Sequence, residues 1–273
     1  MSRPGGTAAG GTGPGPLTRA EIGIWVINLP KNADRRERMA RQLDAMHLPW
    51  TLQEGVDGRA RREELLALAD ETAFERNMGM PLLPGKLGVY ASHLEVWRKL
   101  VASPLKAALV FEDDVVFHLE FPECLDAALA AGAHWDLVRF NCIRARLPIC
   151  QGQVGRWRLN AYAGPFTGNA AYLIHRDVAA RLLPGLRPQT RALDHELNRF
   201  FRHDYRQFGL EPWASHPDDG GVSTITGAGF AEVKKPKWYR RLPHYRLKAA
   251  NYFRRIGWLA RNGYLIPRCN RRL

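Results

Sequence analysis

Cysteine is scarce in this chain, and long apolar runs are missing. The four cysteines (Cys124, Cys142, Cys150 and Cys269) include no CxxC pair, so their spacing indicates neither a zinc site nor a disulfide framework. No apolar run approaches the ~20 residues of a membrane-spanning helix. The first residues also lack the basic-then-apolar pattern of a secretory signal. We therefore expect a reduced, cytoplasmic protein without a spanning helix.

Acidic residues are nearly absent from the last part of the chain. Residues 231–273 hold thirteen Lys and Arg but one acid, Glu232, and so carry +12 of the total charge of +13. Between Tyr245 and Leu259, apolar residues recur at helical spacing, and the basic residues fall largely off that stripe. A basic amphipathic helix suits an anionic membrane surface. A nucleic-acid-binding tail and a helix that packs on the rest of the protein are the alternatives.

The remainder of the chain alternates between strand and helix patterns. Residues 1–20 are rich in Gly, Pro, Thr and Ala without periodicity, and we expect them to be disordered. Strands are predicted at 21–29, 50–56, 107–111, 134–140, 170–174 and 208–214, with helices at 32–47, 61–69, 87–102, 122–131, 177–183 and from 193. This order predicts one α/β domain over residues 21–230, with three layers and a mostly parallel central sheet.

Three consecutive acids, Glu112, Asp113 and Asp114, follow a buried strand pattern. Like charges at the end of a core strand repel one another and lose hydration, so a cation is needed to compensate them. Mg²⁺ and Mn²⁺ prefer oxygen ligands and typically join one or two carboxylates to substrate phosphates. The triplet therefore predicts a metal–diphosphate site at the C-terminal end of a strand. A solvated acidic loop is the alternative.

Four other residues are candidates with equally plain structural explanations. Arg35 follows the first strand and could face a phosphate, but solvated arginines are common in such helices. His93 lies on an apolar helix, where a packed role is more frequent than a ligand role. Gly168 would allow the backbone to approach a ligand or would serve a tight turn. Asp194 could simply cap its helix.

Six segments, in order, resemble one family. They are residues 27–29 (INL) with 35–36 (RR), 54–58 (EGVDG), 88–97 (GVYASHLEVW), 112–114 (EDD), 168–174 (GNAAYLI) and 194–197 (DHEL). Together they are similar to the motifs of glycosyltransferase family 25, which includes bacterial lipooligosaccharide galactosyltransferases and animal procollagen galactosyltransferases. The resemblance covers about residues 22–226, so the extreme N-terminus and the basic tail lie outside it.

The resemblance implies a GT-A fold, a UDP-sugar donor, Mn²⁺ or Mg²⁺ dependence and inversion at the anomeric carbon. In that picture the acidic triplet is the DxD-type motif, and Asp114 is the direct metal ligand together with Glu112. The third metal ligand would be His216, with His195 as the alternative. Asp194 is the expected base, with Glu196 in reserve. The donor site would include Asn28, Arg35, Ser92, His93, Glu112, Asp113, Gly168 and Asn169.

We therefore predict an inverting, metal-dependent glycosyltransferase that moves a sugar, most often galactose, to a lipopolysaccharide-type glycan. The acceptor would be lipid-linked, and residues 231–273 would hold the enzyme on the inner face of the cytoplasmic membrane, with no nucleic acid as partner. Two alternatives remain. The acidic cluster also suits a metal-dependent nucleotidyltransferase or phosphohydrolase, and the basic tail suits a nucleic-acid-binding module.

Overall fold

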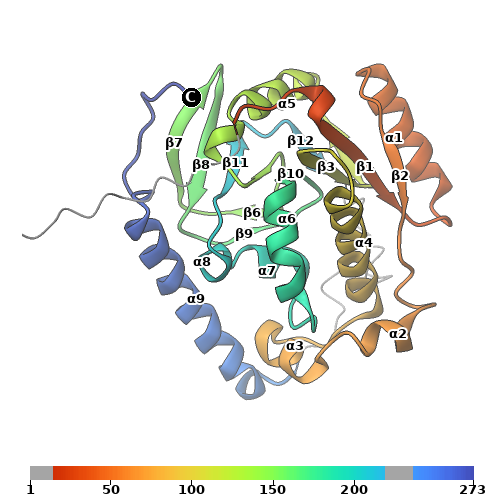
Figure 1. Ribbon diagram of the computed structural model, residues 1–273. Coiled ribbons are helices and arrows are strands. Elements are labelled where there is room, and N and C mark those ends of the chain that lie inside the picture. Colours follow the sequence, from red (N-terminus) through yellow and green to blue (C-terminus); the bar gives the residue numbers. More distant parts are fainter. Residues whose placement is uncertain (1–14, 219–235) are drawn as a thin grey trace, which may run out of the picture.

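The computed structural model describes residues 15–218 and 236–273 and has a mixed α/β fold (Figure 1). At its centre lies an eight-stranded sheet in the order β2-β1-β3-β10-β5-β11-β8-β7. The strands are β1 (Ile22–Asn28), β2 (Thr51–Glu54), β3 (Ala107–Glu112), β5 (Leu137–Arg139), β7 (Pro148–Val154), β8 (Trp157–Tyr162), β10 (Ala171–His175) and β11 (Gln207–Glu211). Two short ribbons lie outside it, β4 (Val115–Phe117) with β12 (Ser215–Pro217) and β6 (Arg144–Ala145) with β9 (Phe166–Thr167).

The sheet is mixed rather than purely parallel. Six strands share one direction, whereas β10 and β8 run against their neighbours. The predicted parallel core is present in β2, β1 and β3, which pair in parallel as successive strand–helix–strand units require. The β7–β8 hairpin turns tightly at Gly155 and Arg156, and so short a connection enforces antiparallel pairing.

Helices connect and cover the strands. They are α1 (Ala33–Ala45), α2 (Arg62–Leu66), α3 (Glu71–Met78), α4 (Pro84–Val101), α5 (Phe121–Ala130), α6 (Arg176–Leu182), α7 (Leu193–Leu197), α8 (Phe200–His203) and α9 (Leu242–Arg261). Single 3₁₀ turns occupy Arg19–Glu21, Gly132–His134, Leu183–Leu186 and Trp238–Arg241. The longest helix of the body, α4, begins with Pro84 in its first turn, a position that proline tolerates. None of the described helices combines the length and apolarity needed to cross a membrane.

The main core surrounds β3. All five residues from Ala107 to Phe111 are fully buried, as expected of a strand covered on both faces. Helices α4 and α6 lie side by side, and α4 packs against β1 and β3 (Figure 1). A second, smaller hydrophobic cluster, centred on Phe74 and Leu87, joins α2, α3 and the start of α4. The core thus fixes the end of β3, where the acidic triplet begins.

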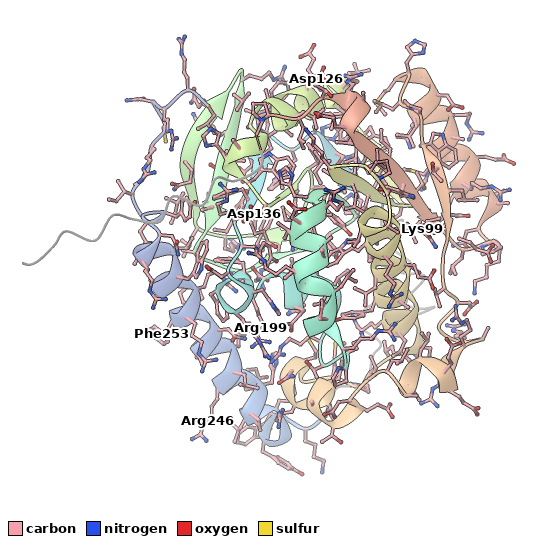
Figure 2. The ribbon with its side chains drawn as sticks, in the orientation of Figure 1. Lys99, Asp126, Asp136, Arg199, Arg246 and Phe253 are labelled. Atoms are coloured by element: carbon pink, nitrogen blue, oxygen red, sulfur yellow. The ribbon has the colours of Figure 1, made fainter. Side chains whose placement is uncertain are left out.

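The chain from residue 242 onward forms α9, which packs along α3 and α8 (Figure 1). The buried residues of α9 are Arg255, Trp258 and Leu259. The expected apolar stripe is therefore not buried as a whole, because Phe253 is 73% exposed. Figure 2 shows Phe253 projecting away from the body. Past α9, the last residues run beside β7, where the Gln153 amide donates to the Arg271 carbonyl at 2.8 Å.

The opposite terminus is also held where the structure describes it. The Leu17 side chain is buried, and its amide donates to the Leu129 carbonyl at 2.9 Å. The Arg19 guanidinium binds Asp126 on α5 at 2.7 Å. The part of the expected disorder that falls on residues 1–14 lies outside the described residues.

Candidate functional site

The central acid of the triplet, Asp113, is bonded to the end of β1 and to α1, the helix that follows it. Its carboxylate accepts from the Asn28 amide at 2.7 Å and pairs with the Arg35 guanidinium at 3.0 Å. The parallel register explains this meeting, because Ile27 of β1 lies opposite Glu112 of β3 and both strands end at the same edge of the sheet. Asn28, Arg35 and Asp113, all predicted from the sequence, therefore lie together.

The first acid, Glu112, is oriented by a buried hydrogen-bonded chain. The His93 Nε2 lies 3.2 Å from the Glu112 carboxylate, and its Nδ1 lies 2.9 Å from the Tyr172 hydroxyl. The Trp97 indole N–H donates to that same hydroxyl at 2.9 Å. Since Glu112 accepts, the proton of a neutral His93 lies on Nε2 and Tyr172 donates to Nδ1. His93 is a fully buried positioning group.

The third acid, Asp114, keeps one carboxylate oxygen without a partner. Its Oδ1 is buried and makes no hydrogen bond to any described residue. Burial first, and then the charges of Glu112 and Asp113, raise the pKa of Asp114 to about 7. A buried carboxylate oxygen without a donor, beside two further carboxylates, is a group that a hard divalent cation would satisfy. The residues present therefore fit Mn²⁺ or Mg²⁺.

That fit concerns a partial site. Within residues 15–218 and 236–273, no group of three or more His, Cys, Asp or Glu side chains is arranged to hold a metal ion. A divalent ion that takes one or two carboxylates and completes its shell with substrate phosphates does not need such a group.

The loop at Gly168 and Asn169 brings the predicted base to the same region. The Gly168 amide donates to the Asp194 carboxylate at 3.1 Å, and Asn169 Nδ2 lies 3.5 Å from His93 Nε2. Gly168 has φ +90, and a Cβ there would lie 2.6 Å from the Ile143 nitrogen, so the position requires glycine. The buried Arg139 donates to the Gly168 carbonyl at 2.7 Å and so holds the loop in place.

Asp194 is not an N-cap. Helix α7 begins at Leu193, after an Ala192 cap position that offers no side-chain hydrogen bond. Burial by itself would raise the pKa of Asp194, but His195, Lys86 and the Gly168 amide outweigh it and hold that pKa below its usual range. Asp194 is therefore ionised at neutral pH and half-buried against the Gly168 loop.

Three other predicted site residues have different partners. Ser92 Oγ accepts from the Val56 amide and donates to the Gly88 carbonyl, both at 2.8 Å, so it joins α4 to the loop after β2. Glu196 is buried among Arg191, Arg199 and His203 at 3.3, 3.1 and 2.9 Å.

Burial would raise the pKa of Glu196, but those three groups lower it to about 2.

The ring of His216 lies 2.9 Å from His118, on the ribbon of β4 and β12. Its role as a metal ligand, like that of His195 on α7, stays a prediction.

A pocket of about 490 Å³ opens between the ends of β1 and β2 and helix α4, and no residue of the triplet is among its lining. Its polar lining consists of Lys31, Gln53, Glu54, Asp57, Arg61 and Glu95. None of these was predicted as a site residue, although Glu54, Asp57 and Glu95 lie in segments that resemble the family motifs. Two of the lining residues, Lys31 and Asp57, form an ion pair at 2.7 Å. The signal available in the sequence was position, because Lys31 and Asp57 lie just after two parallel strands and Gln53 and Glu54 end the second one, and ligands bind at such strand ends in open α/β sheets.

Comparison with known proteins agrees with this geometry. A family model described as glycosyltransferase family 25 (LPS biosynthesis protein) matches residues 21–196, which is more than half of the chain. The chain belongs to glycosyltransferase family 25. The resemblance inferred from the six sequence motifs is thereby confirmed, and the matched region contains the acidic triplet, the Gly168 loop and Asp194.

Several family 25 relatives are animal proteins. Procollagen galactosyltransferase 1 of Danio rerio is 26% identical over 229 residues, which cover 73% of this chain and 38% of that protein. Procollagen galactosyltransferase 2 of Homo sapiens is 34% identical over 123 residues, covering 42% of this chain and 20% of the relative.

An inactive glycosyltransferase 25 family member 3 of Homo sapiens is 32% identical over 132 residues, which cover 42% of this chain and 21% of that protein. The chain thus spans between a fifth and two fifths of the length of these three relatives.

Proposed function

We propose that this family 25 protein transfers a sugar, most often galactose, from a UDP-sugar to a hydroxyl of a lipopolysaccharide-type glycan, with inversion. The observation that carries the proposal is that the three acids differ in their hydrogen-bond partners. Protein groups hold Glu112 and Asp113, whereas Asp114 presents a buried oxygen without a partner. This arrangement favours a cation and a diphosphate over a solvated acidic loop.

On the donor side, the nucleoside would occupy the pocket between the ends of β1 and β2. The adjacent Arg35 guanidinium would face the diphosphate from the start of α1, while its bond to Asp113 keeps it oriented. Mn²⁺ or Mg²⁺ held by Asp114 and Glu112 would neutralise charge on the UDP leaving group. The same arrangement supports a GT-A-like fold, in which the donor lies at the ends of the parallel strands.

On the acceptor side, Asp194 would accept the proton of the attacking hydroxyl. The new glycosidic bond forms as the bond between the sugar and UDP breaks, and the proton moves to a carboxylate oxygen of Asp194. The Gly168 amide donates to Asp194 and would orient that carboxylate during the step. Glu196 is less suited, because two guanidinium groups and an imidazole already occupy its oxygens.

The membrane part of the proposal rests on the outer surface of α9. Leu242 and Tyr245, in the first turn of α9, and Phe253, about two turns further on, are 49%, 42% and 73% exposed, with basic residues around them. Exposed aromatic and basic side chains on one helix suit an anionic bilayer surface. A lipid-linked acceptor on the inner face of the cytoplasmic membrane would be reached from that position, and the family description as an LPS biosynthesis protein supports this choice.

The test is a UDP-release screen of UDP-galactose, UDP-glucose and their N-acetyl forms with an oligosaccharide acceptor, with and without Mn²⁺. We expect release that needs both acceptor and metal. Asp194→Asn should lower turnover by at least about a hundredfold, since general base catalysis contributes that much, while UDP binding is retained.

Consumption of a nucleoside triphosphate with release of pyrophosphate would instead identify a nucleotidyltransferase. No turnover of any donor, despite UDP binding, would place the protein beside the relative that is named inactive.

A further inference from the structure

A groove between α8 and α9, outside the site described above, is lined by four arginines. It has a volume of about 500 Å³. Its lining combines cationic and aromatic side chains around one glycine and consists of Arg199, Phe201, Arg202, Arg254, Gly257, Trp258 and Arg261. No carboxylate among the described residues belongs to that lining. We propose that this groove binds a phosphomonoester group.

The acids nearest to the groove already have partners. Glu196 is held by Arg191, Arg199 and His203. Asp204, at the end of α8, accepts the Trp258 indole N–H at 2.8 Å. In the part of the chain that the structure describes, no acid forms an ion pair with Arg202, Arg254 or Arg261. All three are exposed residues that line one cavity whose lining holds no carboxylate, so an anion there would relieve the repulsion among them.

One polar atom of the lining is also left unsatisfied. The Arg199 side chain is only 8% exposed, and its Nη1 donates to both Glu196 oxygens at 3.1 Å. Its Nε is buried and has no partner among the described residues. A buried donor without an acceptor costs free energy, so Arg199 brings an unmet hydrogen-bond donor to the wall of the groove.

The spacing on α9 suits a small dianion. Arg254 and Arg261 are two turns apart on one side of the helix, and Gly257 lies between them. A Cβ at Gly257 would meet no atom within 4 Å, so the helix backbone forms an open floor between the two guanidinium groups. Arginine matches phosphate geometry through paired N–H donors, which favours a phosphate group over a spherical anion such as chloride.

The phosphate could belong to a soluble molecule or to a lipid headgroup. The full chain is therefore titrated with inorganic phosphate, followed by ³¹P NMR, and with phosphatidylcholine vesicles that contain phosphatidic acid. The variant is Arg254→Gln with Arg261→Gln. Its control, Arg246→Gln with Lys248→Gln, removes the same charge from exposed α9 residues that do not line the groove.

We expect the groove variant to weaken phosphate binding by about tenfold to a hundredfold, as lost charged hydrogen bonds predict. The control should change it by less than about twofold, because Arg246 is about 12 Å along the helix from Arg254 and such exposed charges are screened. A parallel loss of vesicle binding identifies a lipid headgroup, and unchanged vesicle binding identifies a soluble ligand. Equal losses in variant and control, or no phosphate binding by the native chain, would overturn the proposal.

A second variant adds a negative charge to the groove through a side chain of the protein. Gly257→Asp has room for its side chain and should abolish phosphate binding, whereas Gly257→Ala should retain it. Both proteins should fold, and Asp has a lower helix propensity than Ala. A higher Tm for the Asp variant than for the Ala variant at low salt would therefore report relief of arginine repulsion. UDP binding should be equal in all of these variants, so a failure of the proposed transferase function would leave this test intact.

Discussion

At the scale of single residues, the charge on Asp114 sets the pH dependence of the acidic triplet. Its folded pKa of about 7 lies above the ordinary 3.8, so between these values the folded protein binds more protons than the unfolded chain. Stability contributed by the triplet therefore falls as pH rises from about 4 to 7. Asp114→Asn removes this penalty and should raise the Tm of the metal-free protein at pH 8, by about 2–4 °C for each kcal/mol relieved.

Differential scanning fluorimetry from pH 4 to pH 8 measures this effect. The advantage of Asp114→Asn should become small near pH 4, where the carboxyl is protonated in the folded protein and only about half ionised in the unfolded chain. Mn²⁺ should stabilise the native protein and not the variant. Asp177→Asn is the matched control, because that side chain is 86% exposed on α6. An equal response of both variants would contradict the assignment of Asp114 to the cation.

Glu196 and Asp194 are two residues apart, yet replacing Glu196 should mainly lower stability, whereas replacing Asp194 should mainly lower activity. Glu196→Gln leaves two buried guanidinium groups without their anion and should destabilise the fold at pH 7 by about 3–5 kcal/mol. Because the pKa of Glu196 is lowered to about 2, the stability it provides is present above about 4.5 and is lost as pH falls toward 2.

Urea denaturation at pH 7 and pH 3 should therefore show a smaller difference between native protein and Glu196→Gln at the lower pH. Asp194→Asn should lose activity with a much smaller change in stability, since one hydrogen bond to the Gly168 amide can be made by the Asn oxygen. A large stability loss for Asp194→Asn would instead assign it a purely structural role.

Part of this residue-level picture is accessible from the sequence, and the reason is topological. Strands β1 and β3 are parallel neighbours, so Asn28, the last residue of β1, and Asp113, the residue after β3, meet at one sheet edge. The environment of Glu196 follows from tertiary burial instead, which no local pattern encodes. The contact of His216 with His118 depends on a ribbon that joins segments nearly a hundred residues apart.

At the scale of elements, α9 shows that apolar periodicity does not settle which side of a helix is buried. The spacing puts Phe253 and Leu259 on one stripe, but only Leu259 is buried, and the buried side also includes Arg255, which donates to the Ala163 carbonyl at 3.3 Å. Burial lowers the pKa of Arg255 to about 10, yet it stays charged at neutral pH. Periodicity counts apolar residues and does not register a cation that finds carbonyl partners between two loops.

Substitutions on the buried side of α9 should lower stability much more than substitutions on its exposed side. Trp258 is buried against Phe200 and Tyr264, so Trp258→Ala should cost about 3–5 kcal/mol. Phe253→Ser, on the exposed side, should change the free energy of unfolding by less than about 0.5 kcal/mol. Chemical denaturation of both variants measures this contrast. Equal, small effects would mean that α9 does not pack on the body in solution.

At the scale of the whole molecule, charge and exposed aromatic surface coincide. Residues 231–273 carry +12 of the total +13, while residues 1–230 are close to neutral. The described part of that segment also exposes Trp238, Tyr239 and Phe253, at 71%, 47% and 73%. This asymmetry would orient the protein toward an anionic surface, with about 1 kcal/mol for each Lys or Arg near the headgroups.

We therefore expect the full chain to sediment with phosphatidylglycerol vesicles at low salt, to be released at high salt, and to ignore vesicles of phosphatidylcholine alone. Phe253→Ser should weaken binding by about tenfold or more, because a buried Phe side chain contributes about 1.5–3 kcal/mol. Leu119→Ser is the matched control, since Leu119 is 97% exposed on the neutral body. If both substitutions weakened sedimentation equally, or if neutral vesicles bound as well, the contact would not run through α9, and a lipid-linked acceptor would lose its structural support.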